Sequence, residues 1–334
     1  MKNFRIPVLF VVFLFSIISC SEKRNETETA NEIAVPKRFY LPLEYYPHYE
    51  TLFFESGKGY VIKNENSNKL IITLGGGPGW ESAIGRPGER IIGRFIDMFL
   101  PLQEEYNIFI PEKFDWEVGR SYLYDVNARE QYTVDNLLAI YAGVINEYLS
   151  QNDYEPIIIA GISEGAVILP ELYFLLEESH KITALISISG GGLSRFERTR
   201  IEYNKLITGK KPYVAPYIDV RARINGAEYI FDAYREEPYP DTNERMGLIT
   251  TRWLTSYIFR RPYDYYVDID IPVLFIHGEM DINVPVESTK YVQENLPDKP
   301  FDYIYYPEME HSPLLEELLI LREDNKGWLR EKGL

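Results

Sequence analysis

A serine between two glycines, Gly-Ile-Ser-Glu-Gly at residues 161–165, is the feature of this chain with the clearest chemical use. It follows the apolar run Pro-Ile-Ile-Ile-Ala at 156–160 and precedes an apolar helical pattern. A serine on such a strand-to-helix turn exposes its hydroxyl, and the glycines permit the close backbone approach that the turn requires. Ser163 is therefore a candidate nucleophile, and the backbone N–H of Glu164 is placed to bind an oxyanion. The alternative is an ordinary glycine-rich turn that happens to contain serine.

A second glycine-rich loop, Leu-Gly-Gly-Gly-Pro-Gly at residues 74–79, follows an early apolar run. Consecutive glycines let backbone N–H groups approach a substrate oxygen closely, so Gly76 and Gly77 are candidate oxyanion donors. A phosphate-binding loop is the alternative, but no Lys-Ser/Thr pair follows and Pro78 removes one N–H. A nucleotide cofactor is therefore not expected.

An aspartate and a histidine follow Ser163 in the chain order that a Ser-Asp-His hydrolase needs. Asp281 lies in the loop beyond the apolar run at 272–277, and His311 lies just after the last β-rich run. Taken alone, Asp281 could equally be a turn or N-cap carboxylate. His277, at a strand end beside the Asp281 loop, is expected to have a structural role.

Short β-rich runs alternate with helical patterns along most of the chain, which is typical of an α/β fold. The middle runs are continuously apolar, as expected for parallel strands covered on both faces. Helical spacing of apolar residues predicts crossover helices over 134–149 and 166–176. The expected strands are 51–55, 60–63, 69–74, 106–110, 156–160, 184–189, 272–277 and 301–306, the first two antiparallel.

The tyrosine-rich segment from about 193 to 268 breaks this alternation and is predicted to be an inserted cap. The alternative is an irregular excursion whose aromatic residues pack against the body. Its tyrosines and Trp253 could line an aromatic pocket, although such residues more often simply pack. Its glutamates could bind a substrate amine, although exposed carboxylates are usually just solvated. These glutamates are Glu228, Glu236 and Glu237.

These features together resemble the α/β-hydrolase superfamily over about residues 50–330. The resemblance implies a mostly parallel central sheet with helices on both faces and a Ser163-His311-Asp281 triad that needs no metal or organic cofactor. Gly-Gly-Pro-Gly at 76–79, with a cap further along, looks like the prolyl aminopeptidase branch. This chain has Gly75 where that branch usually has His, and it lacks the branch's Asp-Gln-Arg-Gly stretch after the next strand. N-terminal proline specificity is therefore not predicted.

The N-terminus has the pattern of an exported bacterial lipoprotein. Two basic residues precede an apolar run over 6–18, which is too short to span a membrane and is typical of a signal peptide over 1–19. The ending Ile-Ile-Ser-Cys resembles a lipobox, and Cys20 is the only cysteine in the chain. We therefore expect lipid on Cys20, a polar tether over 20–36 and the hydrolase domain over 37–334. An ordinary signal peptide that ends in a free cysteine is the alternative. If the host has two membranes, Ser21 resembles signals for the outer one.

Composition limits the possible partners. The net charge of −16 makes nucleic acid an unexpected partner, and it disfavours strongly anionic substrates. We therefore expect a small-molecule or short-peptide substrate, with the membrane reached only through the N-terminal lipid.

The predicted function is hydrolysis of an ester or amide bond by a serine hydrolase through an acyl-enzyme. The sequence leaves ester, thioester and peptide substrates open. The alternative is a non-catalytic, surface-tethered binding lipoprotein that shares the fold, because fold alone does not establish activity.

Overall fold

The computed structural model describes residues 48–77, 98–113, 131–208, 220–246, 249–311 and 315–334. The expected signal peptide and tether lie outside the described residues. Within those ranges, no helix is both long and apolar enough to cross a membrane.

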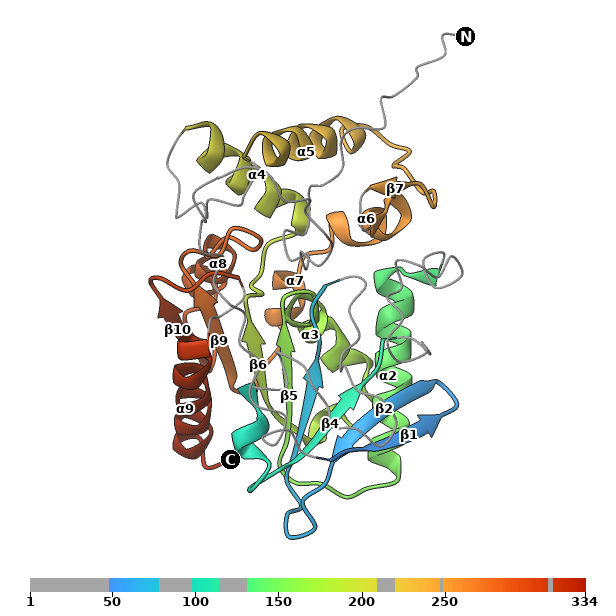
Figure 1. Cartoon of the computed structure of the whole chain (residues 1–334), viewed down its shortest axis with the longest axis vertical. Helices are drawn as coiled ribbons and strands as arrows, with labels where there is room; N and C mark the ends of the chain where they lie inside the picture. The colour runs from blue at the N-terminus through green and yellow to red at the C-terminus, as the bar shows by residue number, and fades with distance from the viewer. Residues whose placement is uncertain (1–47, 78–97, 114–130, 209–219, 247–248, 312–314) are drawn as a thin grey trace, which may run out of the picture.

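The centre of the molecule is an eight-stranded sheet in the order β1-β2-β4-β3-β5-β6-β9-β10 (Figure 1). β2 is antiparallel to both of its neighbours, whereas the pairs from β4 to β10 are all parallel. The strands are β1 Glu50–Phe54, β2 Gly57–Ile62, β3 Leu70–Leu74, β4 Asn107–Pro111, β5 Ile157–Ile162, β6 Ile182–Ile188, β9 Val273–Gly278 and β10 Phe301–Tyr306. All eight expected strands are confirmed to within a few residues, including the antiparallel start.

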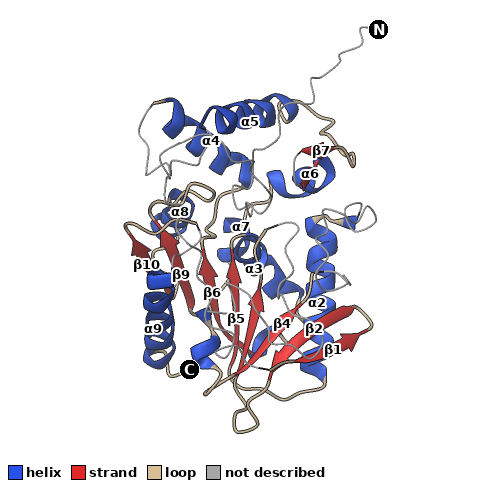
Figure 2. Ribbon diagram, viewed as in Figure 1, coloured by secondary structure: helices blue, strands red, loops and turns tan. Residues whose placement is uncertain are grey.

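Helices cover both faces of the sheet, as Figure 2 shows. α2 (Val134–Ser150) and α3 (Glu164–Leu175) pack on one face, and α9 (Leu315–Glu331) packs on the other together with the short 3-10 helix η3 (Leu100–Leu102). Both predicted crossover helices are present, although α3 begins two residues earlier than expected, immediately after Ser163.

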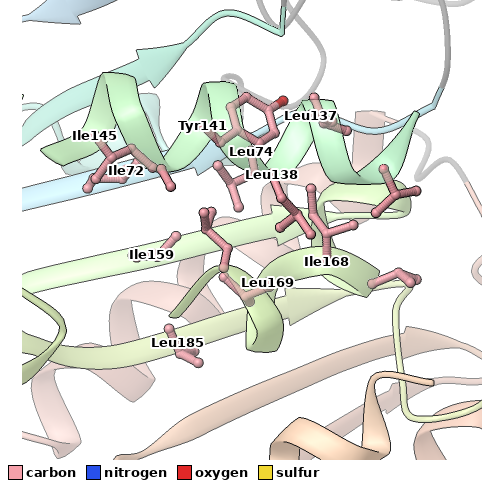
Figure 3. Packing of buried hydrophobic residues seen from close by; sticks show 14 of the residues in the cluster. Ile72, Leu74, Leu137, Leu138, Tyr141, Ile145, Ile159, Ile168, Leu169 and Leu185 are labelled. Atoms are coloured by element: carbon pink, nitrogen blue, oxygen red, sulfur yellow. The ribbon is translucent and has the colours of Figure 1, made fainter. Parts of the chain in front are cut away.

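The alternation of side chains along the strands divides the core into two layers. Ile159 and Leu185 point into the layer under α2 and α3, whereas the preceding Ile158 and following Ile186 belong to the layer beneath α9. Figure 3 shows the first layer, where residues of α2 and α3 meet the strands. Its labelled members are Ile72, Leu74, Leu137, Leu138, Tyr141, Ile145, Ile159, Ile168, Leu169 and Leu185. Burial on both faces explains why these strands are apolar at most positions.

The inserted cap lies between β6 and β9 in the chain. Its helices α4 (Arg195–Ile207), α5 (Val220–Ala233) and α6 (Thr251–Ile258) lie above the carboxyl ends of the strands in Figure 1. Two two-residue strands, β7 (Arg245–Met246) and β8 (Ile249–Thr250), also lie in this segment. The short helix α7 (Tyr263–Tyr266) leads back toward the sheet and packs near α3. α8 (Glu287–Asn295) then joins β9 to β10.

Candidate active site

Ser163 lies on a strained turn between β5 and α3. Its φ of 55° and ψ of −114° are a backbone conformation that residues other than glycine rarely adopt. The turn holds because Ser163 N–H donates to the Ile188 carbonyl at 2.9 Å and Val167 N–H donates to the Ser163 carbonyl at 3.0 Å. A Cβ on Gly161 would lie 2.5 Å from the Gly165 backbone, and one on Gly165 would lie 2.4 Å from the Leu74 carbonyl oxygen. The two glycines of the motif are therefore required by close backbone approach.

The three predicted catalytic side chains form one chain of hydrogen bonds. His311 Nε2 lies 2.9 Å from Ser163 Oγ, and His311 Nδ1 lies 2.7 Å from Asp281 Oδ2. These partners are separated by 148 and 30 residues in the sequence. They come from the ends of β5, β9 and β10, the edge where parallel α/β sheets place their ligand sites.

Asp281 is held so that one oxygen remains directed at His311. Its Oδ1 accepts 2.8 Å hydrogen bonds from the backbone N–H groups of Asn283 and Val284, which leaves Oδ2 for the imidazole. Burial alone would raise the pKa of Asp281, but the interactions with His311, together with the hydrogen bond from the Val284 N–H, outweigh it and hold the pKa below its ordinary value. Asp281 is therefore a carboxylate at neutral pH, as an orienting acid must be.

His277 is occupied in a different way. It is fully buried, with Nε2 2.7 Å from the Val284 carbonyl oxygen and Nδ1 2.7 Å from Thr289 Oγ1. A carbonyl only accepts, so Nε2 carries the proton and Nδ1 accepts from the hydroxyl. Burial lowers the pKa of His277 and keeps it neutral. This arrangement fits the structural role expected from its position.

Contact between the loops after β9 and β10 brings Asp281 and His311 together. Met280 N–H donates to the Met309 carbonyl at 3.1 Å. Gly278 permits this contact, because a Cβ there would lie 2.1 Å from the same carbonyl oxygen.

The glycine-rich loop after β3 lies directly against the nucleophile. A Cβ on Gly76 would lie 2.9 Å from Ser163 Cβ and 3.0 Å from the Ile162 carbonyl oxygen. Gly77 adopts a φ of 65°, in the left-handed region that glycine tolerates. Gly76, Gly77 and Glu164, the predicted oxyanion donors, are thus brought to one place. Glu164 opens α3, where backbone N–H groups have no partner within the helix.

A buried ammonium group connects the glycine-rich loop after β3 to Glu164, the residue that follows the nucleophile. Lys113 Nζ donates to the Gly76 and Gly77 carbonyl oxygens at 3.1 and 2.6 Å, and to Glu164 Oε2 at 2.9 Å. The Lys113 side chain has no exposed surface and that of Glu164 is 3% exposed. Since C=O and N–H point in opposite directions across a trans peptide, Lys113 directs the Gly77 N–H away from itself. The ion pair therefore fixes the orientation of the Gly76–Gly77 peptide relative to Ser163.

The Glu164 carboxylate has two further donors. Tyr132 OH lies 2.6 Å from Oε2, and Trp253 Nε1 of the cap donates to Oε1 at 3.1 Å. Trp253 thus ties cap helix α6 to the residue that follows the nucleophile. Its indole is 3% exposed and contributes a hydrogen bond as well as packing.

Sequence reasoning missed the side-chain roles of Glu164, Lys113, Tyr132 and Trp253. One signal was available: a glutamate that follows the nucleophile and opens a largely apolar helix is expected to be buried, and a buried carboxylate needs a cation or several donors. The identity of that cation could not be predicted, because Lys113 stands 51 residues away in a charged loop.

The remaining residues singled out from the sequence lie at the surface or outside the described residues. Glu228, Glu236 and Glu237 are exposed, as the solvated reading predicts. Cys20 lies outside the described residues. Within the described part of the chain, no cluster of three or more His, Cys, Asp or Glu residues could hold a metal ion.

Several solved structures share this fold at low sequence identity. Est1E from Butyrivibrio proteoclasticus is 17% identical with a TM-score of 0.54, over 85% of this chain and 98% of its own. The esterase Pf2001 from Pyrococcus furiosus is 16% identical with a TM-score of 0.52, over 91% of this chain and 99% of its own. An acylaminoacyl peptidase from Pyrococcus horikoshii is 18% identical with a TM-score of 0.53, over 85% of this chain but only 41% of its own.

Sequence comparison gives the family. No curated protein matches the chain in sequence. The profile of the S33 serine aminopeptidases matches residues 121–318, which is more than half of the chain. The chain has the α/β-hydrolase fold, is a serine hydrolase, and belongs to the S33 serine aminopeptidase family.

Proposed function

We propose that this protein hydrolyses an ester or amide bond through an acyl-enzyme, with Ser163 as nucleophile, His311 as general base and Asp281 as the orienting acid. The observation that carries the proposal is the continuous hydrogen-bonded chain from Ser163 Oγ through His311 to Asp281, at 2.9 and 2.7 Å. The strained backbone at Ser163, which presents the hydroxyl at the carboxyl edge of the sheet, supports it.

In the proposed reaction, His311 Nε2 takes the proton of Ser163 as Oγ attacks the carbonyl carbon. Asp281 holds the imidazole with Nδ1 protonated and stabilises the imidazolium that forms. The carbonyl oxygen becomes an oxyanion, which accepts hydrogen bonds from the N–H of Glu164 and from the Gly76–Gly77 loop. His311 then gives its proton to the leaving group, and water attacks the acyl-enzyme with His311 again as base.

Hydrolysis of 4-nitrophenyl esters and aminoacyl arylamides tests this proposal and separates esterase from peptidase activity. With a good leaving group, deacylation becomes slow relative to acylation, so an ester should give a burst of nitrophenol followed by a slower steady rate. Ser163→Ala should abolish both phases, because no covalent acyl-enzyme can form. A steady rate that survives in Ser163→Ala would refute the assigned nucleophile.

The non-catalytic alternative, a surface-tethered binding protein, makes the opposite prediction. A binding protein would have no use for strain at the serine or for a carboxylate directed at the histidine. Wild-type protein that gives neither a burst nor turnover on either substrate class would favour this alternative.

We further propose that the protein is exported and anchored through lipid on Cys20, which would place the hydrolase domain at the surface of a cell envelope. The support is the short apolar run over 6–18 that ends in Ile-Ile-Ser-Cys. Cys20→Ala should move the protein from the membrane fraction to the soluble fraction of cells. A variant that still sediments with membranes would show that the anchor lies elsewhere.

A further inference from the structure

The inward face of cap helix α4 is polar, although a buried helix face is ordinarily apolar. Arg195, Arg198 and Glu202 recur at helical spacing, so they lie on one side of the helix, with Thr199 beside them. Arg198 is 1% exposed and Thr199 is 4% exposed. Four polar side chains on the buried side of a cap helix need hydrogen-bond or ionic partners, from the protein or from a ligand.

The same cluster reaches the loop that carries Asp281. Arg195 NH1 donates to the Asn283 carbonyl at 3.2 Å. Arg223, from the neighbouring helix α5, donates to Asn283 Oδ1 at 2.6 Å and forms a 3.1 Å ion pair with Glu202. The Asn283 N–H in turn donates a hydrogen bond to Asp281, so Asn283 connects the cluster directly to the proposed triad.

A second chain of contacts links the cluster to Glu164, the residue that follows the nucleophile. Arg198 NH2 donates to Tyr257 OH at 2.8 Å. The Tyr257 ring packs against Trp253, with centroids 4.9 Å apart, and Trp253 donates to Glu164. The cluster therefore contacts the Asp281 loop through Arg195 and Arg223, and it is linked through Arg198 to the residue after Ser163.

Positive charge exceeds negative charge within this cluster. Glu202 pairs with Arg223, but among the described residues no salt bridge joins Arg195 or Arg198 to a carboxylate. Nε of both arginines and Oγ1 of Thr199 are buried and have no hydrogen-bond partner in the described part of the chain. Burial, together with Arg198 and Arg223, lowers the pKa of Arg195 to about 10. Glu202, which favours the charge on Arg195 as well as pairing with Arg223, is the one carboxylate that the described residues of this cluster supply for three guanidinium groups. Buried positive charge in excess of carboxylate is costly, so its retention beside the reaction centre suggests that an anion arrives with the substrate.

We infer that Arg195 and Arg198 bind a free carboxylate of the substrate, so that the enzyme prefers esters or amides carrying a carboxylate near the scissile bond. The guanidinium groups offer the fork of N–H donors that matches a carboxylate, and Thr199 offers a hydroxyl. This inference rests on the proposed hydrolytic function and names its substrate class. The negative net charge of the chain led us to expect that strongly anionic substrates are disfavoured. The arginine cluster makes the local charge positive, so we expect the opposite preference at this site. The exposed cap glutamates make recognition of a substrate amine the weaker alternative.

Two matched substrate pairs test the inference, one for each side of the scissile bond. The first pair is 4-nitrophenyl hydrogen adipate and its methyl ester, in which a methyl group removes the charge at the far end of the acyl chain. The second is 4-acetoxybenzoate and its methyl ester, which differ in a charge on the leaving group. In at least one pair, wild-type enzyme should favour the anionic member in kcat/KM by about tenfold or more.

Variants then assign the preference to the cluster. Arg198→Met should lower the anionic-to-neutral ratio of kcat/KM by about tenfold or more, because charge-assisted hydrogen bonds to the carboxylate are lost. Arg200→Met is the matched control, since Arg200 is exposed on the same helix, and it should keep the wild-type ratio. If Arg198→Met does not fold, Arg195→Gln carries the same test.

The outcomes separate this inference from the proposed function. Wild-type enzyme that hydrolyses the neutral members as well as or better than the anionic ones would overturn the inference while leaving the proposed function intact. A preference that persists in both Arg198→Met and Arg195→Gln would overturn the assignment to these residues. Hydrolysis of none of the four compounds would count against the proposed function itself.

Discussion

Replacing Lys113 with methionine removes the ammonium but keeps most of the side-chain volume, so it tests the buried ion pair. Three hydrogen bonds are lost, to Glu164 and to the Gly76 and Gly77 carbonyl oxygens. Among the described residues, Tyr132 and Trp253 would remain as side-chain donors to the Glu164 carboxylate, which would stay buried. Breaking a buried ion pair by removing one partner typically costs about 3–5 kcal/mol of unfolding free energy.

The expected effect on catalysis follows from the loop that Lys113 holds. Without the ammonium, the Gly76–Gly77 peptide is free to rotate away from the position that an oxyanion needs. Loss of one aligned oxyanion donor costs about 3 kcal/mol of transition-state stabilisation, so kcat for a 4-nitrophenyl ester should fall about 100-fold with KM nearly unchanged. A residue that only supported the fold would not alter kcat in molecules that remain folded.

A double variant separates the charge from the orientation. Lys113→Met with Glu164→Gln removes both charges, so most of the lost stability should return, while kcat should stay low because no cation holds the glycine carbonyls.

Urea unfolding and steady-state kinetics measure these quantities. Lys181→Met is the matched control, because the exposed pair of Lys181 with Glu178 should contribute less than about 1 kcal/mol. Lys113→Met protein with wild-type kcat and an unfolding free energy within 1 kcal/mol of wild type would refute this reasoning.

Three further predictions follow from the site. Gly76→Ala should lower kcat at least about tenfold in ester assays, because the added Cβ would lie 2.9 Å from Ser163 Cβ. Gly327→Ala is the control: a Cβ added there meets no described atom within 4 Å, so the variant should keep full activity and gain up to about 1 kcal/mol of unfolding free energy in urea. Burial lowers the pKa of His277, so below about pH 6.5 this residue binds more protons in the unfolded protein than in the folded one. The unfolding free energy should therefore fall by up to about 1.4 kcal/mol for each unit of decreasing pH in that range, and His277→Gln should reduce this slope. Asp281→Asn should lower kcat by about four orders of magnitude, because the amide no longer stabilises the imidazolium; a loss under tenfold would show that another group orients His311.

Much of the fold could be predicted from local patterns. The isoleucine run before Ser163 predicts a strand covered on both faces, and β5 is buried between two helical layers. The alternation of such runs with helical spacing sufficed for all eight strands of the sheet. The end of one strand and the start of the next helix are less well determined, because turn residues such as Pro285 permit several starting points; α8 begins at Glu287.

The residues of the site also differ in whether the sequence alone predicts their roles. Ser163, Asp281 and His311 could be predicted because each follows a strand, and parallel strands deliver their carboxyl ends to one edge. Lys113 and the arginines of α4 could not be predicted, because their roles depend on burial and on contacts across the chain. A lysine in a charged loop and arginines on a polar helix look solvated in sequence, and only tertiary packing shows that Lys113 and Arg198 are enclosed.

Labelling with a fluorophosphonate probe tests the central claim most directly, because the probe reacts only with a serine whose hydroxyl is activated by an aligned base. Wild-type protein should be labelled at Ser163, as peptide mass spectrometry would show, and Ser163→Ala and His311→Ala should both lose the label. A wild-type protein that remains unlabelled, or a label found on another serine, would contradict the assignment of Ser163, His311 and Asp281 as the catalytic residues.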